Sequence, residues 1–517
     1  MILEPGRNCQ DVFDVWETGL LVDARNYYRA LYHSARKARR YILLAGWQFD
    51  SEVSLLRGED TAEAEGDTRL LPFLTSLCVR NPQLNVYVLA WDFSVVFSLE
   101  REWFQSWIFR WMTNERVHFI FDDKHAIGAS HHQKLAVIDG LLAFVGGMDV
   151  CADRWDDASH LSVDPRRTDP GGDPYGPYHD IQSYHTGPAA GRLAELFLHR
   201  WINAGGKAFD PAPAAPDTDY RIDCSRRLPT GRVAVSRTHA RSFTPFLEKP
   251  VQEIRNLYVD AIEAAEKLVY IENQYFSSHA VYDALKRRMT YPDRRALQVV
   301  IVLPEKPQAL LEEISMGLVQ AKMIRSLTET AGERGHSIGI YYSVAPPEDE
   351  ISRATYIHSK LLLVDDIFLS VGSANATNRS MGLDTELNVS WEAEQEDDRL
   401  RRSIRHVRIA LLAEHTGLGE IRYLRRFVDT EGLVGYLSEL AEGGTCRLRT
   451  HTIESLTREV KWLDELGAED FSLDPEKPVI EENVYEMLVK DNKGFFSDGI
   501  GILGKWLQSK QGSGEGK

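Results

Sequence analysis

The sequence predicts an α/β fold made of two similar halves. Helix-like and strand-like runs alternate along the chain, the same order of runs occurs twice, and one short motif occurs once in each half. At 517 residues the chain is longer than a single hydrophobic core usually supports, so we expect at least two domains.

Each half begins with a helical pattern that leads into short apolar runs. In the first half we expect a helix at Tyr27–Arg39 and strands at Tyr41–Gly46, Asn85–Trp91, Leu135–Ile138 and Ala143–Val145. In the second half we expect helices at Val251–Lys267 and Ile314–Arg334 and strands at Leu268–Glu272, Leu297–Leu303, Ile338–Tyr342, Leu361–Val364 and Ile367–Val371. The matching order indicates an internal duplication.

Breaks in these patterns suggest four units. They are a first lobe at 1–210, a linker at 211–235, a second lobe at 236–419 and a helical, acidic C-terminal extension at 420–517. The segment Arg154–His179 is rich in Asp, Pro and Gly and is too long for an idle connection, so we expect a functional loop near the site.

Composition excludes several classes of protein. Apolar residues make up 43% of the chain, which is ordinary for a globular protein. The net charge of −17 argues against binding to nucleic acid and against general attraction to anionic membranes. We see no signal peptide and no apolar stretch long enough to span a membrane, and we expect a cytoplasmic location, at most peripheral to a membrane. The cysteines are odd in number and scattered along the chain, which fits a reducing compartment. They are Cys9, Cys78, Cys151, Cys224 and Cys446.

The repeated motif has the form H-x-K-x-x-x-x-D. The first copy holds His132, Lys134 and Asp139, and the second holds His358, Lys360 and Asp365. In each copy His and Lys alternate at the start of an apolar strand, so they share one face. Each copy also has a small-residue turn 14 residues after its histidine. One copy would be a weak signal, but two copies with equal offsets predict a shared site.

The motif residues and their surroundings resemble those of a known family. The chain resembles the phospholipase D superfamily from about Val22 to Leu418, and is most similar to phospholipase D itself and to bacterial phospholipase D-like proteins. Besides both motifs, the resemblance rests on GGMDVCADRWD (146–156), YHDIQSYHTGPAAGRLAELFLHRW (178–201), YIENQYF (270–276), GSANATNRSMGLDTE (372–386) and AEHTGL (413–418). It implies two lobes with mixed sheets flanked by helices and related by a pseudo-twofold axis, whose motifs meet at the lobe interface.

The motif residues suit phosphodiester chemistry. Two histidines can supply a nucleophile and a proton donor near neutral pH, and two lysines can bind the phosphate oxygens. The residues alone leave open which histidine attacks. The resemblance implies that His132 forms a phosphohistidine intermediate and that His358 protonates the leaving group.

Further residues are expected to support this site. In the turn after the second motif, Asn375 should donate to the phosphate and Ser373 should bind or support it. At the position that matches Asn375 stands Asp149, which either plays a supporting role or binds a cation. We expect Glu386 and Asp156 to orient the histidines.

Asp139 and Asp365 complete the motifs, and we expect them mainly to fix the turn and a neighbouring basic group. Because no His, Cys or Asp cluster has metal-ligand spacing, we predict no metal and no cofactor.

Two features have open interpretations. Three tryptophans in Glu102–Trp111 fall on one helix face, which indicates either a packed core face or a wall for acyl chains. Arg154, Arg379 and His179 either line the pocket or form salt bridges.

The leading hypothesis is a phospholipase D that cleaves the headgroup of a phospholipid, with transfer of the phosphatidyl group to an alcohol as a further possibility. A phosphatidyltransferase resembling cardiolipin synthase and a phosphodiesterase or nuclease with a non-lipid substrate are the alternatives, and a non-catalytic module is disfavoured by the intact motifs. We expect a phospholipid as partner, transient contact with a membrane surface, no nucleic acid, and a monomer, since one chain holds both half-sites.

Overall fold

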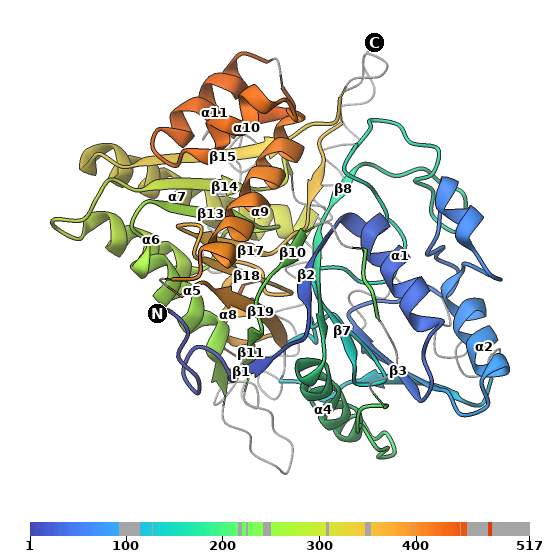
Figure 1. Cartoon of the computed structure of the whole chain (residues 1–517). Coiled ribbons are helices and arrows are strands. Elements are labelled where there is room, and N and C mark those ends of the chain that lie inside the picture. The colour runs from blue at the N-terminus through green and yellow to red at the C-terminus, as the bar shows by residue number, and fades with distance from the viewer. Residues whose placement is uncertain are drawn as a thin grey trace, which may run out of the picture.

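The computed structural model describes residues 1–92, 114–126, 128–215, 220–223, 226–240, 250–306, 310–346, 353–394, 396–444, 446–451 and 474–477. Two α/β lobes lie side by side, the first in blue to green and the second in green to orange (Figure 1). The tryptophan segment Glu102–Trp111 and Cys224 lie outside the described residues.

The first lobe contains an eight-stranded mixed sheet. In spatial order its strands are β10 (Arg226–Leu228), β2 (Thr18–Val22), β9 (Ile181–Thr186), β7 (Leu142–Gly146), β6 (Leu135–Ile138), β3 (Tyr41–Gly46), β4 (Asn85–Trp91) and β5 (Val117–Asp122). Its helices are α1 (Asp23–Ala35), α2 (Leu70–Arg80) and α4 (Pro188–Asn203), with a 3-10 turn at Gly58–Glu63. The helix expected at Tyr27–Arg39 therefore begins four residues earlier and ends four residues earlier.

The second lobe contains a ten-stranded mixed sheet. In spatial order its strands are β1 (Asp11–Asp14), β11 (Arg232–His239), β19 (Glu386–Glu392), β18 (Phe368–Gly372), β17 (Leu361–Val364), β13 (Leu268–Glu272), β14 (Gln298–Val302), β15 (Ser337–Ser343) and β20 (Leu448–Thr450), and β12 (Val251–Gln252) pairs with β11. Its helices are α5 (Glu253–Ala264), α6 (His279–Thr290), α7 (Leu310–Arg334), α8 (Asn378–Gly382), α9 (Asp398–Thr416), α10 (Ile421–Val428) and α11 (Leu433–Glu442). A separate parallel pair joins β8 (Tyr178–His179) of the first lobe to β16 (Tyr356–Ile357) of the second.

The duplication expected from the sequence extends to every central strand. The order β2-β9-β7-β6-β3-β4-β5 in the first sheet matches β11-β19-β18-β17-β13-β14-β15 in the second. In both sheets the last three strands are parallel and the other neighbours are antiparallel. The motif strands β6 and β17 therefore occupy equivalent central positions.

The lobes exchange edge strands, which the expected boundaries did not foresee. The N-terminal β1 pairs with β11 of the second sheet, and β10 from the expected linker pairs with β2 of the first. Both strands are short and lack apolar alternation, reading DVFD and RRL, so their pairing left no sequence signal.

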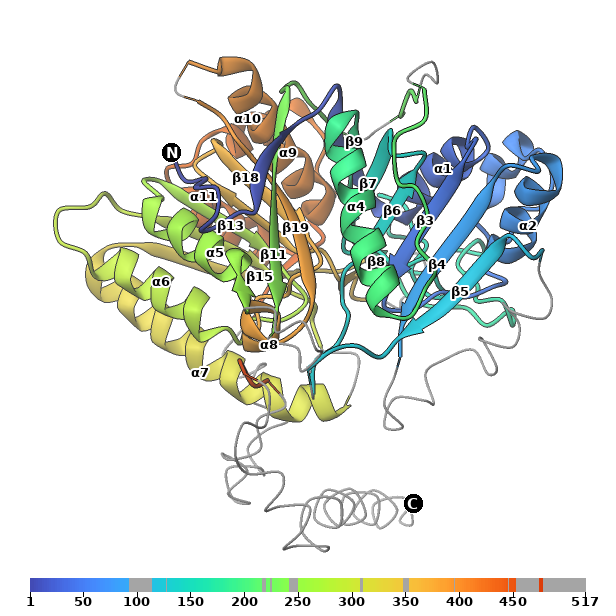
Figure 2. The ribbon, with the colours of Figure 1, turned by 90° about the horizontal axis from the view of Figure 1, so that it is seen from below.

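Hydrophobic cores lie on both faces of each sheet. The largest one joins the inner faces of the two sheets to α4 and α9, and β7 and β9 contact β18 and β19 there. Two others lie outside, between the first sheet and α1 and α2, and between the second sheet and α5, α6 and α7. Figure 2 shows the two sheets meeting at the centre with helices on the outer sides.

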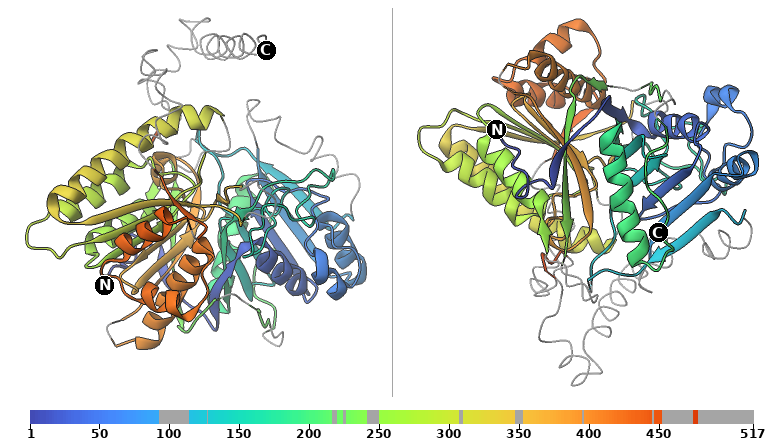
Figure 3. Two further views of the ribbon diagram at one scale, coloured as in Figure 1. Left: turned by 90° about the horizontal axis from the view of Figure 1, so that it is seen from above. Right: turned by 60° about the horizontal axis from the view of Figure 1, so that its bottom comes forward.

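The C-terminal extension is less separate than expected. α10 and α11 are helical as predicted and cover one end of the second lobe (Figure 3), but β20 adds an edge strand to its sheet. No helix among the described residues is both long and apolar enough to cross a membrane.

Candidate functional site

Each motif is anchored on the opposite lobe. His132 and Lys134 come directly before β6, and His358 and Lys360 come directly before β17. Both strands have the bounds expected from the sequence, and the motif histidines and lysines precede them. The backbone N–H of His132 donates to the carbonyl of Thr385 over 2.9 Å, and that of His358 donates to the carbonyl of His179 over 2.8 Å. These bonds bring both motifs to the lobe interface.

A carboxylate of the opposite lobe holds each histidine. His132 Nδ1 lies 3.1 Å from both carboxylate oxygens of Glu386, and His358 Nδ1 lies 2.6 Å from Asp180 Oδ2. Because a carboxylate accepts hydrogen bonds, each ring carries its proton on Nδ1 and keeps a lone pair on Nε2. Both imidazoles are thus poised as nucleophiles or bases.

Asp180 occupies the place in which we expected Asp156. Asp156 instead binds the ring of His160 at 2.8 Å and the guanidinium of Arg167 at 3.0 Å. Asp156 was chosen because it lies in the segment that follows the first motif, whereas the carboxylate beside His358 comes after the irregular segment 154–177.

Asp180 and Glu386 occupy equivalent positions when the strand registers of the two sheets are compared. Gly146 pairs with Gln182 in the first sheet, and Gly372 pairs with Asn388 in the second. Two residues before these partners stand Asp180 and Glu386 respectively. The signal in the sequence is the likeness of Asp180-Ile-Gln to Glu386-Leu-Asn.

The lysines have unequal partners. Lys134 Nζ lies 3.0 Å from Asp149 Oδ2, so the cation that Asp149 binds is the lysine of its own lobe. Lys360 Nζ donates to Gln274 Oε1 over 3.2 Å. Gln274, in the YIENQYF segment, was not singled out from the sequence as a site residue. Lys134 therefore has a carboxylate partner, whereas Lys360 donates to neutral oxygens of Gln274 and His358.

The turn after the second motif supports Glu386. Ser373 Oγ donates to one carboxylate oxygen of Glu386, and Ser380 Oγ donates to the other over 2.7 Å. Asn375 is 7% exposed and its Oδ1 has no hydrogen-bond partner. The hydroxyls thus fix the carboxylate that holds His132.

Burial sets the protonation of the site. It lowers the pKa of both His132 and His358 well below the usual range, and the nearby lysines lower it further. Burial raises the pKa of Asp180 to about 7, against the opposing charge of Lys360. It raises that of Glu386 to about 7 as well, against the hydroxyls of Ser373 and Ser380. Each His–carboxylate pair therefore gains or loses a proton near neutral pH.

The motif aspartates lie at the far ends of β6 and β17 from the histidines. Asp139 accepts hydrogen bonds from the backbone amides of residues 39, 40 and 41, and Asp365 accepts them from residues 266, 267 and 268. Both residues adopt a φ of +53°, which Asp tolerates better than most residues. They fasten the turn to the start of the neighbouring strand and do not contact the histidines.

The loop 154–177 contacts the site. Arg154 packs over the ring of Tyr178 at 5.1 Å, and that ring lies 5.4 Å from the ring of His358. Arg379 forms a salt bridge with Asp384 at 2.9 Å, which is one of its two expected roles. His179 is fully buried and its ring lies beside the carboxylates of Asp23, Glu272 and Glu414, so its ion pairs are not on the surface.

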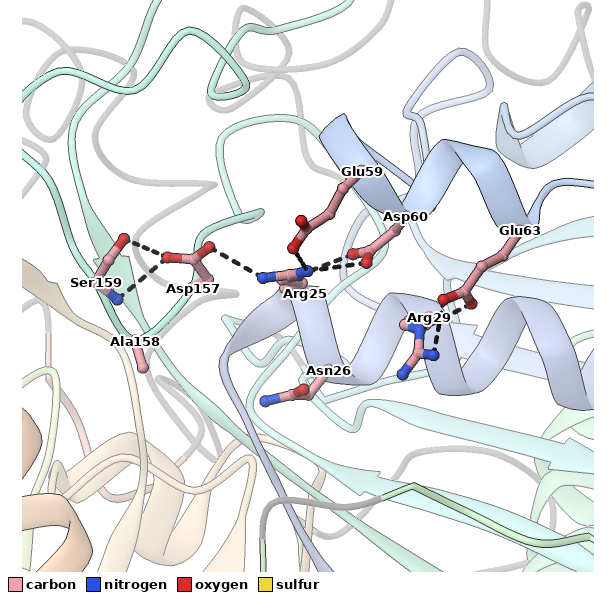
Figure 4. A pocket seen from close by; sticks show the side chains of 9 residues that line it. All are labelled: Arg25, Asn26, Arg29, Glu59, Asp60, Glu63, Asp157, Ala158 and Ser159. Carbon is pink, nitrogen blue, oxygen red and sulfur yellow. Dashed lines mark hydrogen bonds and ion pairs between the residues drawn. The ribbon is translucent and has the colours of Figure 1, made fainter.

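A hollow on the first lobe holds neither motif histidine. Figure 4 shows its charged side chains turned toward one another. Arg25 pairs with Asp60 at 2.8 Å, and Arg29 pairs with Glu63 at 2.8 Å. With its charges paired in this way, the hollow offers no reactive group. Among the described residues, the groups of His, Asp and Glu that are close enough to share an ion also exclude both motif histidines.

Comparisons with known proteins agree on one family. Residues 34–291 match the family described as "Phospholipase D", and residues 258–408 match the one described as "Cardiolipin synthase, PLD-like domain". "Phospholipase D alpha 1" of Carica papaya is 24% identical over 81% of this chain and 65% of its own length. "Phospholipase D1" of Schizosaccharomyces pombe is 23% identical over 80% of this chain and 36% of its own length. The chain thus spans about two thirds of one relative and about a third of the other.

Among solved structures, a phosphatidylserine synthase of Haemophilus influenzae is similar, with a TM-score of 0.48 and 12% identity. The match covers 84% of this chain and 95% of that one.

Proposed function

The chain belongs to the phospholipase D superfamily, and from this membership we propose that it is a phosphodiesterase that cleaves the distal phosphodiester bond of a phospholipid. The observation that carries the proposal is the pair of motif histidines. One comes from each lobe, each is held by a carboxylate of the other lobe, and two lysines accompany them. This arrangement offers two imidazoles and two ammonium groups to one phosphate.

In the first step, His132 Nε2 attacks phosphorus and forms a P–N bond while the bond to the headgroup oxygen breaks. The His358–Asp180 pair enters this step with one extra proton, carried on His358 Nε2. His358 gives that proton to the leaving oxygen, so the headgroup leaves as a neutral hydroxyl. Lys134, Lys360 and Asn375 bind the non-bridging oxygens.

In the second step, His358, now neutral, removes a proton from water or from an alcohol. The oxygen of this acceptor attacks phosphorus, the P–N bond breaks, and His132 regains its lone pair. Glu386 stabilises the positive charge that His132 carries while it is phosphorylated. Water yields a phosphatidic acid, and an alcohol yields a new phosphodiester.

The site should work best near neutral pH. Burial raises the pKa of Asp180 and Glu386 to about 7. Below this pH the His132–Glu386 pair gains a proton and the nucleophile is lost. Above it the His358–Asp180 pair loses the proton that the leaving group needs, and Lys360, whose pKa burial lowers to about 7, loses its charge. We expect a bell-shaped plot of kcat/KM between about pH 5 and about pH 9, and a flat plot over this range would contradict the assignment.

Added alcohol should divert the product. Because the second step accepts any small hydroxyl compound that reaches phosphorus, ethanol should convert part of a phosphatidylcholine substrate into phosphatidylethanol. Release of choline should continue while phosphatidic acid falls, as measured by mass spectrometry of the lipids. Water as the sole acceptor at every ethanol concentration would contradict the two-step path.

The same assay separates the alternatives. A phosphatidyltransferase acting between lipids would convert phosphatidylglycerol into cardiolipin, an activity that the match to the "Cardiolipin synthase, PLD-like domain" family favours. Cleavage of single-stranded DNA or of a bis(nitrophenyl) phosphate, with neither lipid turned over, would indicate a non-lipid phosphodiesterase.

A further inference from the structure

A second cluster of polar groups lies between the lobes, separate from the phosphate site. It gathers Asp23 at the start of α1, His160 in the loop 154–177, His179 in β8 and Glu414 near the end of α9. The first three belong to the first lobe and Glu414 belongs to the second. Asp23, His160 and His179 are each at most 1% exposed.

Carboxylates surround both histidines of this cluster. One nitrogen of each ring, here called the inner nitrogen, faces the centre of the cluster. His179 Nδ1 lies 3.1 Å from Asp23 and 2.8 Å from Glu414, and His160 Nε2 lies 3.3 Å from Glu414. On the outer side, His160 Nδ1 lies 2.8 Å from Asp156, and His179 Nε2 lies 3.0 Å from Glu272.

A neutral imidazole can donate from one nitrogen only. If each ring donates outward to its carboxylate, the inner nitrogens present lone pairs to the oxygens of Asp23 and Glu414. That arrangement is repulsive unless positive charge stands between them. Two extra protons or one divalent cation would supply it.

One atom favours the cation. Asp23 Oδ2 is buried and has no hydrogen-bond partner, and the inner nitrogen of His160 lies 3.8 Å away, beyond hydrogen-bond distance. Protons on the histidines would leave this oxygen unsatisfied at a cost of roughly 1–3 kcal/mol or more. An ion at the centre of the four residues would bind it.

We propose that Asp23, His160, His179 and Glu414 bind one Zn²⁺ ion that joins the two lobes. Bonds of about 2.0–2.1 Å in tetrahedral geometry place ligand atoms about 3.3 Å apart. With Asp23 Oδ2 as the ligand atom, the separations of 2.8, 3.3 and 3.8 Å among the four atoms bracket this value. Two imidazole nitrogens among four ligands suit a transition metal and not Ca²⁺ or Mg²⁺, which prefer oxygen.

The outer carboxylates match what such sites require. A metal-bound histidine usually donates its other N–H to a carboxylate, which fixes the ring. Asp156 and Glu272 occupy these positions. Glu272 also accepts from Tyr270, Ser359 and His415 at 2.6, 2.7 and 2.9 Å, so its oxygens are already engaged and it serves as an outer partner.

The ion would steady the histidine that handles protons. The carbonyl of His179 accepts from the backbone of His358, and the next residue, Asp180, holds the ring of His358. Ser359 donates to Glu272. The proposed ion departs from the prediction of no metal made from the sequence. It touches neither phosphate nor motif residue, so it does not conflict with chemistry that needs no catalytic metal.

Metal content of the full chain tests the proposal. The protein, expressed without a polyhistidine tag in zinc-supplemented medium, should carry about one Zn²⁺ per chain by mass spectrometry of the elements. His160→Ala and Asp23→Asn should lose it. Asp156→Asn keeps all four ligands and should weaken affinity about 10- to 100-fold. His33→Ala removes a histidine that pairs with Glu63 on the surface at 2.8 Å and should leave the content unchanged.

A measurement on the unaltered protein protects the test against misfolded variants. Chain stripped of metal should show a higher thermal midpoint when Zn²⁺ is added, and Co²⁺ in its place should give visible d–d absorption bands. The proposal would be overturned, in favour of two buried imidazolium ions, if wild-type protein carried no transition metal and its thermal midpoint did not rise when Zn²⁺ was added. Binding of Ca²⁺ or Mg²⁺ in place of a transition metal would overturn it as well.

Discussion

Replacing His132 with asparagine is expected to abolish turnover and to prevent any covalent intermediate from forming. Asn keeps a polar side chain that can bind Glu386 but offers phosphorus no nucleophilic nitrogen. We expect kcat to fall at least about 10⁴-fold, since removal of one member of a group that acts as a unit costs nearly the whole contribution of the group. His358→Asn should cause a loss of similar size by slowing both chemical steps.

A trapping experiment separates the two variants. Protein is mixed briefly with a phospholipid carrying labelled phosphorus, quenched in alkali because phosphohistidine is labile in acid, and mapped by mass spectrometry. Wild type should carry the label on His132, and His358→Asn should carry it too. Label on His358 alone would reverse the two roles, and no label in any sample would favour direct attack by water.

His185→Asn is a matched control for both variants. This histidine is also fully buried, but its nitrogens contact the hydroxyls of Thr18 and Ser183 at 3.0 and 2.9 Å. It should lower stability and leave kcat of the folded protein close to that of wild type.

Much of the fold follows from the sequence because its central strands are nearly all apolar. Tyr41–Gly46, Asn85–Trp91, Leu268–Glu272 and Leu361–Val364 have the bounds that their residues predict. Burial on both faces of a strand leaves such an uninterrupted signal. The exchanged strands β1 and β10 carry little apolar surface, and only backbone pairing with a distant partner identifies them.

The candidate site also contains residues that the sequence predicts and residues that it does not. His132, Lys134, His358 and Lys360 lie in a repeated local pattern, so their offsets are visible without a structure. The carboxylate beside His358 lies 178 residues away in the chain, and only the register between β7 and β9 places it there. The likeness of the segment after the first motif to the family pointed to Asp156, which binds His160 instead. Partners that belong to opposite lobes leave no local spacing to read.

Asp180 is therefore the residue whose replacement tests the structure most directly. In Asp180→Asn an amide N–H₂ can donate to His358 Nδ1 and shift the ring proton to Nε2, where the lone pair is needed as a base. An amide also fails to stabilise the imidazolium. By the same argument that applies to the carboxylate of a serine protease triad, kcat should fall about 10⁴-fold with little change in geometry.

A substrate with a different leaving group shows which of the two chemical steps the substitution slows. A phosphodiester with a nitrophenyl leaving group needs no proton to depart, so Asp180→Asn should still release a first equivalent of nitrophenol rapidly and then stall, because His358 cannot activate water. Glu386→Gln, which disturbs the nucleophile, should slow this first release instead. Rapid-mixing absorbance measures both.

Asp366→Asn is the matched control. It removes a charge from another buried aspartate, 4% exposed, which pairs with Arg408 at 2.7 Å. Since Asp366 contacts neither histidine, this variant should unfold at lower denaturant concentration while its kcat stays near that of wild type. Asp180→Asn should show the opposite pattern, with kcat lost and the folded protein retained. If Asp180→Asn kept kcat within about tenfold of wild type, the carboxylate would not control the His358 proton, and the acid–base role derived from the 2.6 Å contact would be wrong.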